Sequence, residues 1–234
     1  MIPLKDYNPT RRRPVVTVAL IALCVLVFLW QISGGAHGFQ RTVYGLGMIP
    51  AVLTGRARLA AGLEMVDPWA TLLTSMFLHG GWMHLIGNML YLWIFGNNVE
   101  DRFGHLGFLA FYLASGLAAA AAQILPDPAS ETPMVGASGA ISGVLGAYLV
   151  FFPRARVLVL IPVGFMFVYT LPAAWLLGFW FLFQILSALA TPATAGGVAW
   201  WAHIGGFVFG VVVAILVRER TAAGGRSRRP GPWG

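Results

Sequence analysis

The sequence has little charge, few acidic residues and almost no cysteine. Charged residues make up 10% of the 234 residues, and only eight residues are Asp or Glu, whereas about a quarter of an average soluble domain is charged. Disordered chains are polar and charge-rich, so a chain that is 58% hydrophobic with a mean hydropathy of +0.77 does not belong to that class. The single cysteine, Cys24, excludes a disulfide scaffold and is expected to fill space inside an apolar segment.

The net charge of +7 comes without a basic stripe beside a soluble core, so the sequence does not indicate a nucleic-acid partner. The remaining class is a polytopic membrane protein with one domain. Membrane lipid, anionic lipid in particular, is the partner that the basic residues favour.

Six segments are apolar over about the 20 residues that a helix needs to cross roughly 30 Å of hydrocarbon. The first could be a secretion signal, but its apolar run is too long, so it is interpreted as a retained span. The sequence therefore predicts an all-α fold, a bundle of six transmembrane helices over residues 14–217 with a long, partly membrane-embedded first loop. Residues 1–13 are expected to be a cytoplasmic segment and residues 218–234 a disordered basic tail. The expected spans are Pro14–Ile32, Trp82–Val99, Leu106–Ile124, Ser138–Phe152, Leu171–Leu189 and Trp200–Val217.

Lys and Arg gather on one side of these spans. Twelve fall in the N-terminal segment, the C-terminal tail and the connections after the second and fourth spans, while the other side has only Arg41, Arg56 and Arg58. Because Lys and Arg favour the cytoplasmic side, both termini are expected in the cytoplasm. The other side holds the first loop, residues 33–81, whose apolar stretches Tyr44–Leu53 and Trp69–Leu78 are too short to span and predict a structure half-buried in the outer leaflet.

Polar side chains inside spans are costly and need a reason. The second, fourth and sixth spans run from outside to inside, and each carries polar residues near its outer end: His84 and Asn88, then Ser138, then His203. The fourth span measures about 22 Å, short of the hydrocarbon thickness, so Ser138 should lie below the outer surface. Residues 126–137 would dip inward to reach it, which predicts a water-bearing pocket open to the outside.

Ser138 has two interpretations. Gly139, Gly143 and Gly146 follow it at the spacing typical of close helix packing, and a serine can belong to such a face. It also begins a helix, where free N–H groups and the positive end of the dipole stabilise an alkoxide and an adjacent oxyanion. The second interpretation makes Ser138 a nucleophile.

His203 lies near the start of the last span, with Gly206 and Gly210 on roughly the same face. Such a glycine face lets another helix approach closely, and the glycine-rich face of the fourth span is the expected partner. His203 would then reach the Ser138 hydroxyl and act as a general base. Spans four to six hold no Asp or Glu to orient the ring, so a dyad is expected instead of a triad.

His84 and Asn88 are four residues apart and share one face of the second span. Two donors aimed at one point suit an oxyanion hole, and a structural hydrogen bond between helices is the alternative. His79 adds a third imidazole, but no His-Glu-x-x-His pattern or acidic ligand accompanies it, so no metal site is expected. His37 and His105 show no partner pattern and are expected on the surface.

Four stretches resemble motifs of the rhomboid intramembrane serine proteases, in the order and on the spans where that family carries them. They are Phe77–Asn88, similar to the family's His-x-x-x-Asn region; Glu100-Asp101-Arg102, similar to its Glu-x-Arg motif; Gly136-Ala137-Ser138-Gly139, similar to its nucleophile motif; and Ala202–Gly206 with Gly210, similar to its last catalytic helix. The likeness covers about Trp69 to Val217.

The resemblance implies a bacterial-type protease with six transmembrane spans in the inner membrane, open to the extracytoplasmic side. It would cleave transmembrane protein substrates without a cofactor. Ser138 would be the nucleophile and His203 the base, while His84, Asn88 and the Ser138 N–H would bind the oxyanion. His79, Gly139, Gly206 and Gly210 would be structural members of the motifs, and Glu100 and Arg102 would brace the first loop.

Substrate would enter beside the fifth span, at an aromatic face made of Trp175, Phe179, Trp180 and Phe183, for which lipid contact is the alternative. Two positions depart from the family pattern. Ala70 follows Trp69 where many members have Arg, and Ser142 stands where well-studied members have a Tyr beneath the histidine.

Two other functions compete with proteolysis. A catalytically inactive relative that binds membrane proteins would lack the serine or the histidine, and both are present. A transporter would carry charged residues at the midplane or a repeat between its halves, and the sequence shows neither.

Overall fold

The fold is dominated by helices. The computed structural model describes residues 1–163, 165–191 and 197–226. The long helices begin and end within a few residues of the expected spans, except that α9 continues beyond Val217 into the segment expected to be disordered; residues 227–234 of that segment lie outside the described residues. These helices are α1 (Val15–Ser33), α5 (Trp82–Phe103), α6 (His105–Ile124), α7 (Ser138–Phe151), α8 (Ala173–Ala190) and α9 (Trp200–Arg226).

Four of these helices are long and apolar enough to cross a membrane: α1, α6, α8 and the Trp200–Glu219 part of α9. Helix α7 is apolar but has 14 residues, a length of about 21 Å. Helix α5 has 22 residues and ends in the charged run from Glu100 to Arg102. The chain is therefore a largely helical membrane protein with four long apolar helices.

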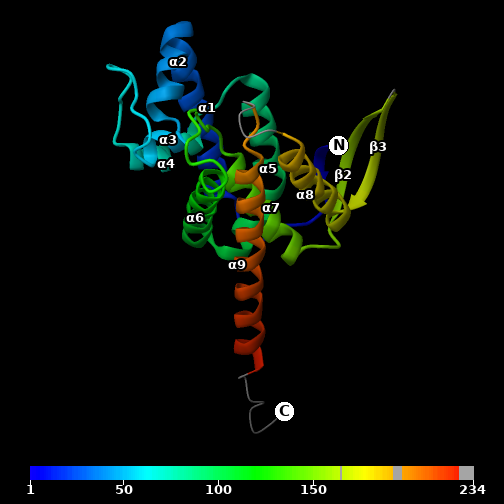
Figure 1. Ribbon diagram of the computed structural model, residues 1–234. Helices are drawn as coiled ribbons and strands as arrows, with labels where there is room; N and C mark the ends of the chain where they lie inside the picture. The colour runs from blue at the N-terminus through cyan, green and yellow to red at the C-terminus, as the bar shows by residue number, and fades with distance from the viewer. Residues whose placement is uncertain (164, 192–196, 227–234) are drawn as a thin grey trace, which may run out of the picture.

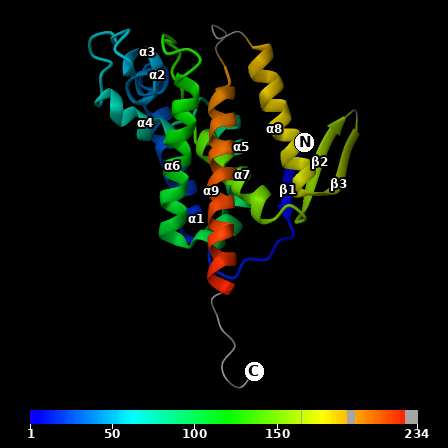
Figure 2. The same cartoon turned by 60° about the horizontal axis from the view of Figure 1, so that its bottom comes forward.

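The expectation of an all-α fold is wrong, because three strands form an antiparallel sheet in the order β1-β2-β3. Strands β2 (Arg156–Val163) and β3 (Phe165–Pro172) make a hairpin that runs beside α8 (Figures 1 and 2). Strand β1 (Ile2–Asp6) adds the N-terminus to it, pairing Asp6 with Val157. Val157, Val159 and Ile161 are β-branched and alternate with leucines, which is a strand signal inside a segment interpreted as a connection between spans.

The first loop folds into short helices at one end of the bundle, at the upper left of Figure 1. Its elements are α2 (Gly35–Leu46), α3 (Pro50–Leu53), the 3-10 turn η1 (Pro68–Ala70), α4 (Thr71–Thr74) and the 3-10 turn η2 (Ser75–Phe77). The stretches expected to be too short to span do form short helices of this kind. Their place in the outer leaflet stays a prediction.

Helix α7 is the centre of the bundle, and every residue from Gly139 to Tyr148 is buried. It packs against α9 through backbone atoms: a Cβ added at Gly206 would overlap the carbonyl oxygen of Gly139, and one added at Gly210 would overlap that of Gly143. The predicted contact between the two glycine faces is thus confirmed. Glycine is needed at these positions because a side chain would push the two helices apart.

Glu100 does not brace the first loop, which corrects the expectation from the sequence. Its buried carboxylate accepts hydrogen bonds from the N–H of Val16 at 2.9 Å and from the N–H and hydroxyl of Thr17 at 2.8 and 2.6 Å. Those donors belong to the first turn of α1, where four backbone N–H groups lack partners within the helix. Glu100 is therefore a cap supplied to α1 by another helix.

Two further residues near Glu100 also differ from expectation. Arg102 lies over the ring of Phe151, 5.3 Å from its centroid, at the end of α7 and away from the first loop. His105 is exposed, as expected, but it does not lack a partner, because its Nδ1 is 2.6 Å from a carboxylate oxygen of Glu100. Glu100 near the end of α5 thus contacts the first turns of both α1 and α6.

Replacing Glu100 by Gln should lower the free energy of unfolding by about 2 kcal/mol, because one amide oxygen cannot satisfy donors that a buried carboxylate accepts. Thermal unfolding in detergent micelles measures the change. Glu131→Gln alters an exposed carboxylate of the same type and should leave the midpoint in place. Equal midpoints for Glu100→Gln and the parent would contradict the cap.

Gly210→Ala should destabilise the protein by about 1–3 kcal/mol, because the added methyl group meets backbone that has no room to move aside. Gly178→Ala is the matched control, since a Cβ there meets nothing within 4 Å. That variant should be neutral or stabilised by up to about 1 kcal/mol through helix propensity. If Gly210→Ala unfolds at the temperature of the parent, the α7–α9 contact tolerates a side chain at this position, and the prediction is wrong.

Candidate active site

Ser138 and His203 meet between α7 and α9. Ser138 is the first residue of α7, and His203 lies in the first turn of α9. The Nε2 of His203 is 2.8 Å from the Ser138 Oγ. The imidazole is buried, whereas the serine is partly exposed. The structure therefore brings together the two side chains that the sequence placed on separate spans.

The segment before Ser138 is held by the first loop. Met134 and Met48 exchange backbone hydrogen bonds of 3.1 and 2.8 Å, and the N–H of Gly136 donates to the carbonyl of Ser75 at 2.9 Å. Gly136 has a φ of +126°, which favours glycine and lets the chain turn into α7. The N-cap residue of α7 is Ala137, and no described side chain caps the helix there, so the uncapped positive end of its dipole lies at Ser138.

The start of α9 is fixed by a side chain from α6. The Oε1 of Gln123 accepts a hydrogen bond from the N–H of Ala202 at 3.1 Å, which satisfies one donor of the first turn of α9. His203 is the next residue. Its position relative to α7 is thus set both by this cap and by the glycine contacts further along the helix.

Gln184 of α8 is the residue that the sequence analysis missed. Its Oε1 is 2.8 Å from the Nδ1 of His203, opposite the nitrogen that contacts Ser138. Gln184 is 3% exposed although it lies in an apolar helix. Its signal in the sequence is an uncharged amide within an apolar span, which can orient a histidine as a carboxylate does.

His84 and Asn88 lie on α5 beside the turn that leads to Ser138. A Cβ added at Gly136 would be 2.7 Å from the Nε2 of His84 and 3.6 Å from the Nδ2 of Asn88. The N–H of Gly80 donates to the Nδ1 of His84 at 3.3 Å, so a neutral His84 carries its proton on Nε2 and is a donor there. The buried Nδ2 of Asn88 has no acceptor among the described residues.

His79 is part of the scaffold next to this group. Gln31 of α1 clamps its peptide, accepting from its N–H at 3.0 Å and donating to its carbonyl at 3.5 Å. The buried ring packs edge-on against His84, with ring centroids 5.2 Å apart. Burial, with His84 beside it, lowers the pKa of His79 to about 4, so the ring is neutral near pH 7.

Ser142, at the position of the family's Tyr, is buried and donates its hydroxyl to the carbonyl of Ser138 at 2.7 Å. It puts no ring beneath His203. Two indoles flank the imidazole instead, with centroids 5.9 Å away for Trp180 and 6.2 Å away for Trp200. In the first loop, Trp69 is exposed and Asp67 accepts from its N–H at 2.9 Å, which holds η1 without the family's Arg.

The four aromatic residues expected to form one face of α8 do not share a face. Trp175, Phe179 and Phe183 follow at intervals of four and are each more than half exposed. Trp180 turns inward, where it contacts His203 and Phe207. The outer aromatic face of α8 is therefore smaller than expected, and the fourth ring belongs to the environment of His203.

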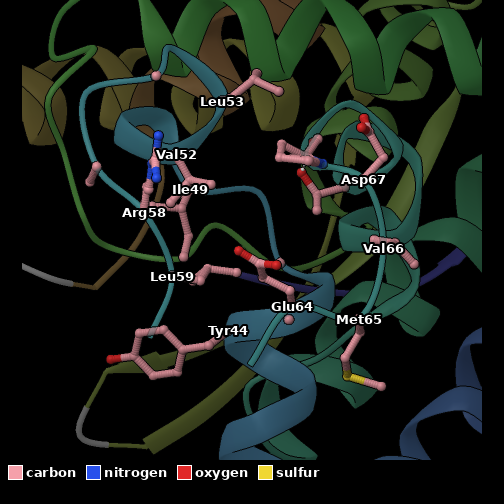
Figure 3. A pocket seen from close by; sticks show the side chains of 16 residues that line it. Tyr44, Ile49, Val52, Leu53, Arg58, Leu59, Glu64, Met65, Val66 and Asp67 are labelled. Atoms are coloured by element: carbon pink, nitrogen blue, oxygen red, sulfur yellow. Dashed lines mark hydrogen bonds between the residues drawn. The ribbon is translucent and has the colours of Figure 1, made fainter. Parts of the chain in front are cut away.

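A hollow of about 720 Å³ lies in the first loop, away from these residues. Figure 3 shows its lining, which includes Tyr44, Arg58, Glu64 and Met65. Ser138, His203, His84 and Asn88 are not part of that lining. Within the described part of the chain, no three His, Cys, Asp or Glu side chains lie close enough together to hold a metal ion.

Comparisons with known proteins find one family. A model of the rhomboid domain matches residues 67–220. Similar proteins include RHOMBOID-like protein 5 of Arabidopsis thaliana (42% identical over 118 residues), rhomboid protease GluP of Bacillus subtilis (37% over 138) and mitochondrial Rhomboid protein 1 of Saccharomyces cerevisiae (30% over 185). The matches cover 49%, 58% and 75% of this chain but only 38%, 24% and 50% of the three relatives. The chain thus spans at most about half the length of these relatives.

Proposed function

Because this chain belongs to the rhomboid family of membrane proteins, we propose that it is an intramembrane serine protease that hydrolyses peptide bonds of transmembrane protein substrates. The observation that carries the proposal is the 2.8 Å contact between the Ser138 Oγ and the His203 Nε2. A hydroxyl activated by a neighbouring imidazole is the arrangement that acyl transfer uses. One of the similar proteins, from Bacillus subtilis, is itself named a protease.

In the proposed reaction, the Ser138 Oγ attacks the carbonyl carbon of the scissile peptide while its proton passes to the His203 Nε2. The tetrahedral intermediate then collapses, and the same proton goes to the leaving amine. Water next attacks the acyl-enzyme and gives a proton to His203, and collapse of the second intermediate returns that proton to the Ser138 Oγ. The products are a carboxylic acid and an amine, and no cofactor takes part.

The oxyanion of each intermediate would be bound by the Ser138 N–H, the His84 Nε2–H and the Asn88 amide. Two features support this assignment. The Asn88 Nδ2 is a buried donor without an acceptor among residues 1–163, 165–191 and 197–226, which is costly unless the reaction uses it. The start of α7 also favours negative charge at Ser138 through its dipole.

The proposal includes the membrane arrangement. Helices α5 and α7 join α1, α6, α8 and α9 as spans, which makes the six-transmembrane, bacterial-type architecture. The excess of Lys and Arg on one side favours a topology with both termini on the cytoplasmic side of the inner membrane. The outer ends of α5, α7 and α9 then carry the site, which opens to the extracytoplasmic side, and substrate enters beside α8.

The dyad can be tested with a fluorophosphonate probe on the purified protein. Labelling should be lost in Ser138→Ala and strongly reduced in His203→Ala, because the probe reports an activated serine. Ser115→Ala removes another buried serine hydroxyl, which donates to the Phe111 carbonyl, and should label like the parent. Equal labelling of all four proteins, or a parent that does not label, would refute the proposed function and favour a catalytically inactive relative.

Asn88→Ala should lower the turnover of a transmembrane substrate by about ten- to a thousandfold, because it removes one oxyanion donor. The unfolding temperature should change little. Asn97→Ala makes the same change at the other end of α5 and should keep full turnover. Unchanged turnover in Asn88→Ala would make this amide structural.

A further inference from the structure

The contacts of Gln184 settle which way its amide points. Its Nε2 is 3.3 Å from the carbonyl oxygen of Trp180, one turn earlier in α8. A carbonyl oxygen can only accept a hydrogen bond, so the amide nitrogen must face it. The amide oxygen then faces the imidazole of His203, at 2.8 Å.

This orientation fixes the proton on the imidazole. Because the amide oxygen can only accept, the Nδ1 of His203 must carry a hydrogen. In a neutral ring the Nε2 is then left with its lone pair, and it lies 2.8 Å from the Ser138 hydroxyl. Two hydrogen bonds thus link Gln184 of α8 to His203 of α9 and His203 to Ser138 of α7. The donor and the acceptor of both bonds are assigned.

We propose that Gln184 is a positioning residue that holds His203 in the tautomer and orientation needed for a general base. This inference rests on the proposed function and supplies the third member that the dyad lacks. The amide oxygen would also stabilise the imidazolium that forms when the Ser138 proton is transferred, because His203 is buried and the hydrogen bond from its Nδ1 goes to that oxygen. Gln184 does not touch the reacting atoms.

Packing alone does not account for a glutamine here. The other inward positions of α8 are apolar, among them Ala173, Leu176, Leu177 and Ala188. A buried amide is costly unless both of its ends are hydrogen-bonded, and both ends of Gln184 are. An apolar residue would fill the same space without that requirement.

Two near-isosteric substitutions separate the positioning role from packing. Gln184→Glu keeps an acceptor toward His203, whereas Gln184→Met keeps the length and loses the acceptor. If Gln184 positions the base, kcat and the rate of fluorophosphonate labelling should fall by about ten- to a hundredfold in the Met variant, with KM little changed. The Glu variant should stay within about threefold of the parent. If the side chain only packs, the Met variant should be the more active of the two, because Glu buries a carboxyl group.

A second measurement needs no variant at Gln184. In ¹⁵N spectra of the histidine-labelled parent, with the His203 signals identified by their loss in His203→Asn, Nδ1 should be protonated and Nε2 unprotonated. The opposite tautomer, or Met and Glu variants with equal rates, would overturn the role of Gln184. A parent protein that the probe does not label would instead refute the proposed function, so the two failures are distinguishable.

Discussion

The close approach of α7 and α9 is the constraint on which the rest of the site depends. Where Gly206 and Gly210 face the carbonyl oxygens of Gly139 and Gly143, nothing but backbone separates the two helices. In lipid, where apolar surface alone does not drive helices together, such contact is a main source of association. It also fixes the distance between the serine that begins one helix and the histidine in the first turn of the other. The contact between Ser138 and His203 therefore depends on the glycines further along both helices.

Around that contact, other elements each position one part of the site. The first loop holds Gly136 and so sets where α7 begins. Helix α6 caps α9 through Gln123, and α8 reaches the far nitrogen of His203 through Gln184. Helix α5 brings His84 and Asn88 to the turn before Ser138. Asn88, Gln184 and His203 are buried, and inside a protein a hydrogen bond is stronger and an unpaired polar group more costly than in water.

The sequence was informative where one physical requirement dominates a local pattern. Hydrophobic length located the helices, glycine spacing predicted the α7–α9 face, and the cost of polar groups in lipid singled out Ser138, His203, His84 and Asn88. The sequence was uninformative where a residue forms its hydrogen bonds with a segment that is distant in the chain. Strand β1 pairs with a hairpin more than 150 residues later in the chain, in a segment interpreted as a connection between spans. Glu100 was assigned to the wrong partner, and Gln184 was missed, because an amide or carboxylate reveals its donor only once the helices are packed.

The cap that Glu100 gives to α1 has a consequence for biosynthesis. Val16 and Thr17 emerge from the ribosome more than 80 residues before the carboxylate that receives their hydrogen bonds. Asp101 likewise accepts from the N–H groups of Arg11 and Arg12. Until the end of α5 has been made, the first helix enters the membrane with its leading N–H groups satisfied only by water or headgroups. The first helix therefore reaches its final hydrogen-bonded state only after α5 has been synthesised and has packed against it.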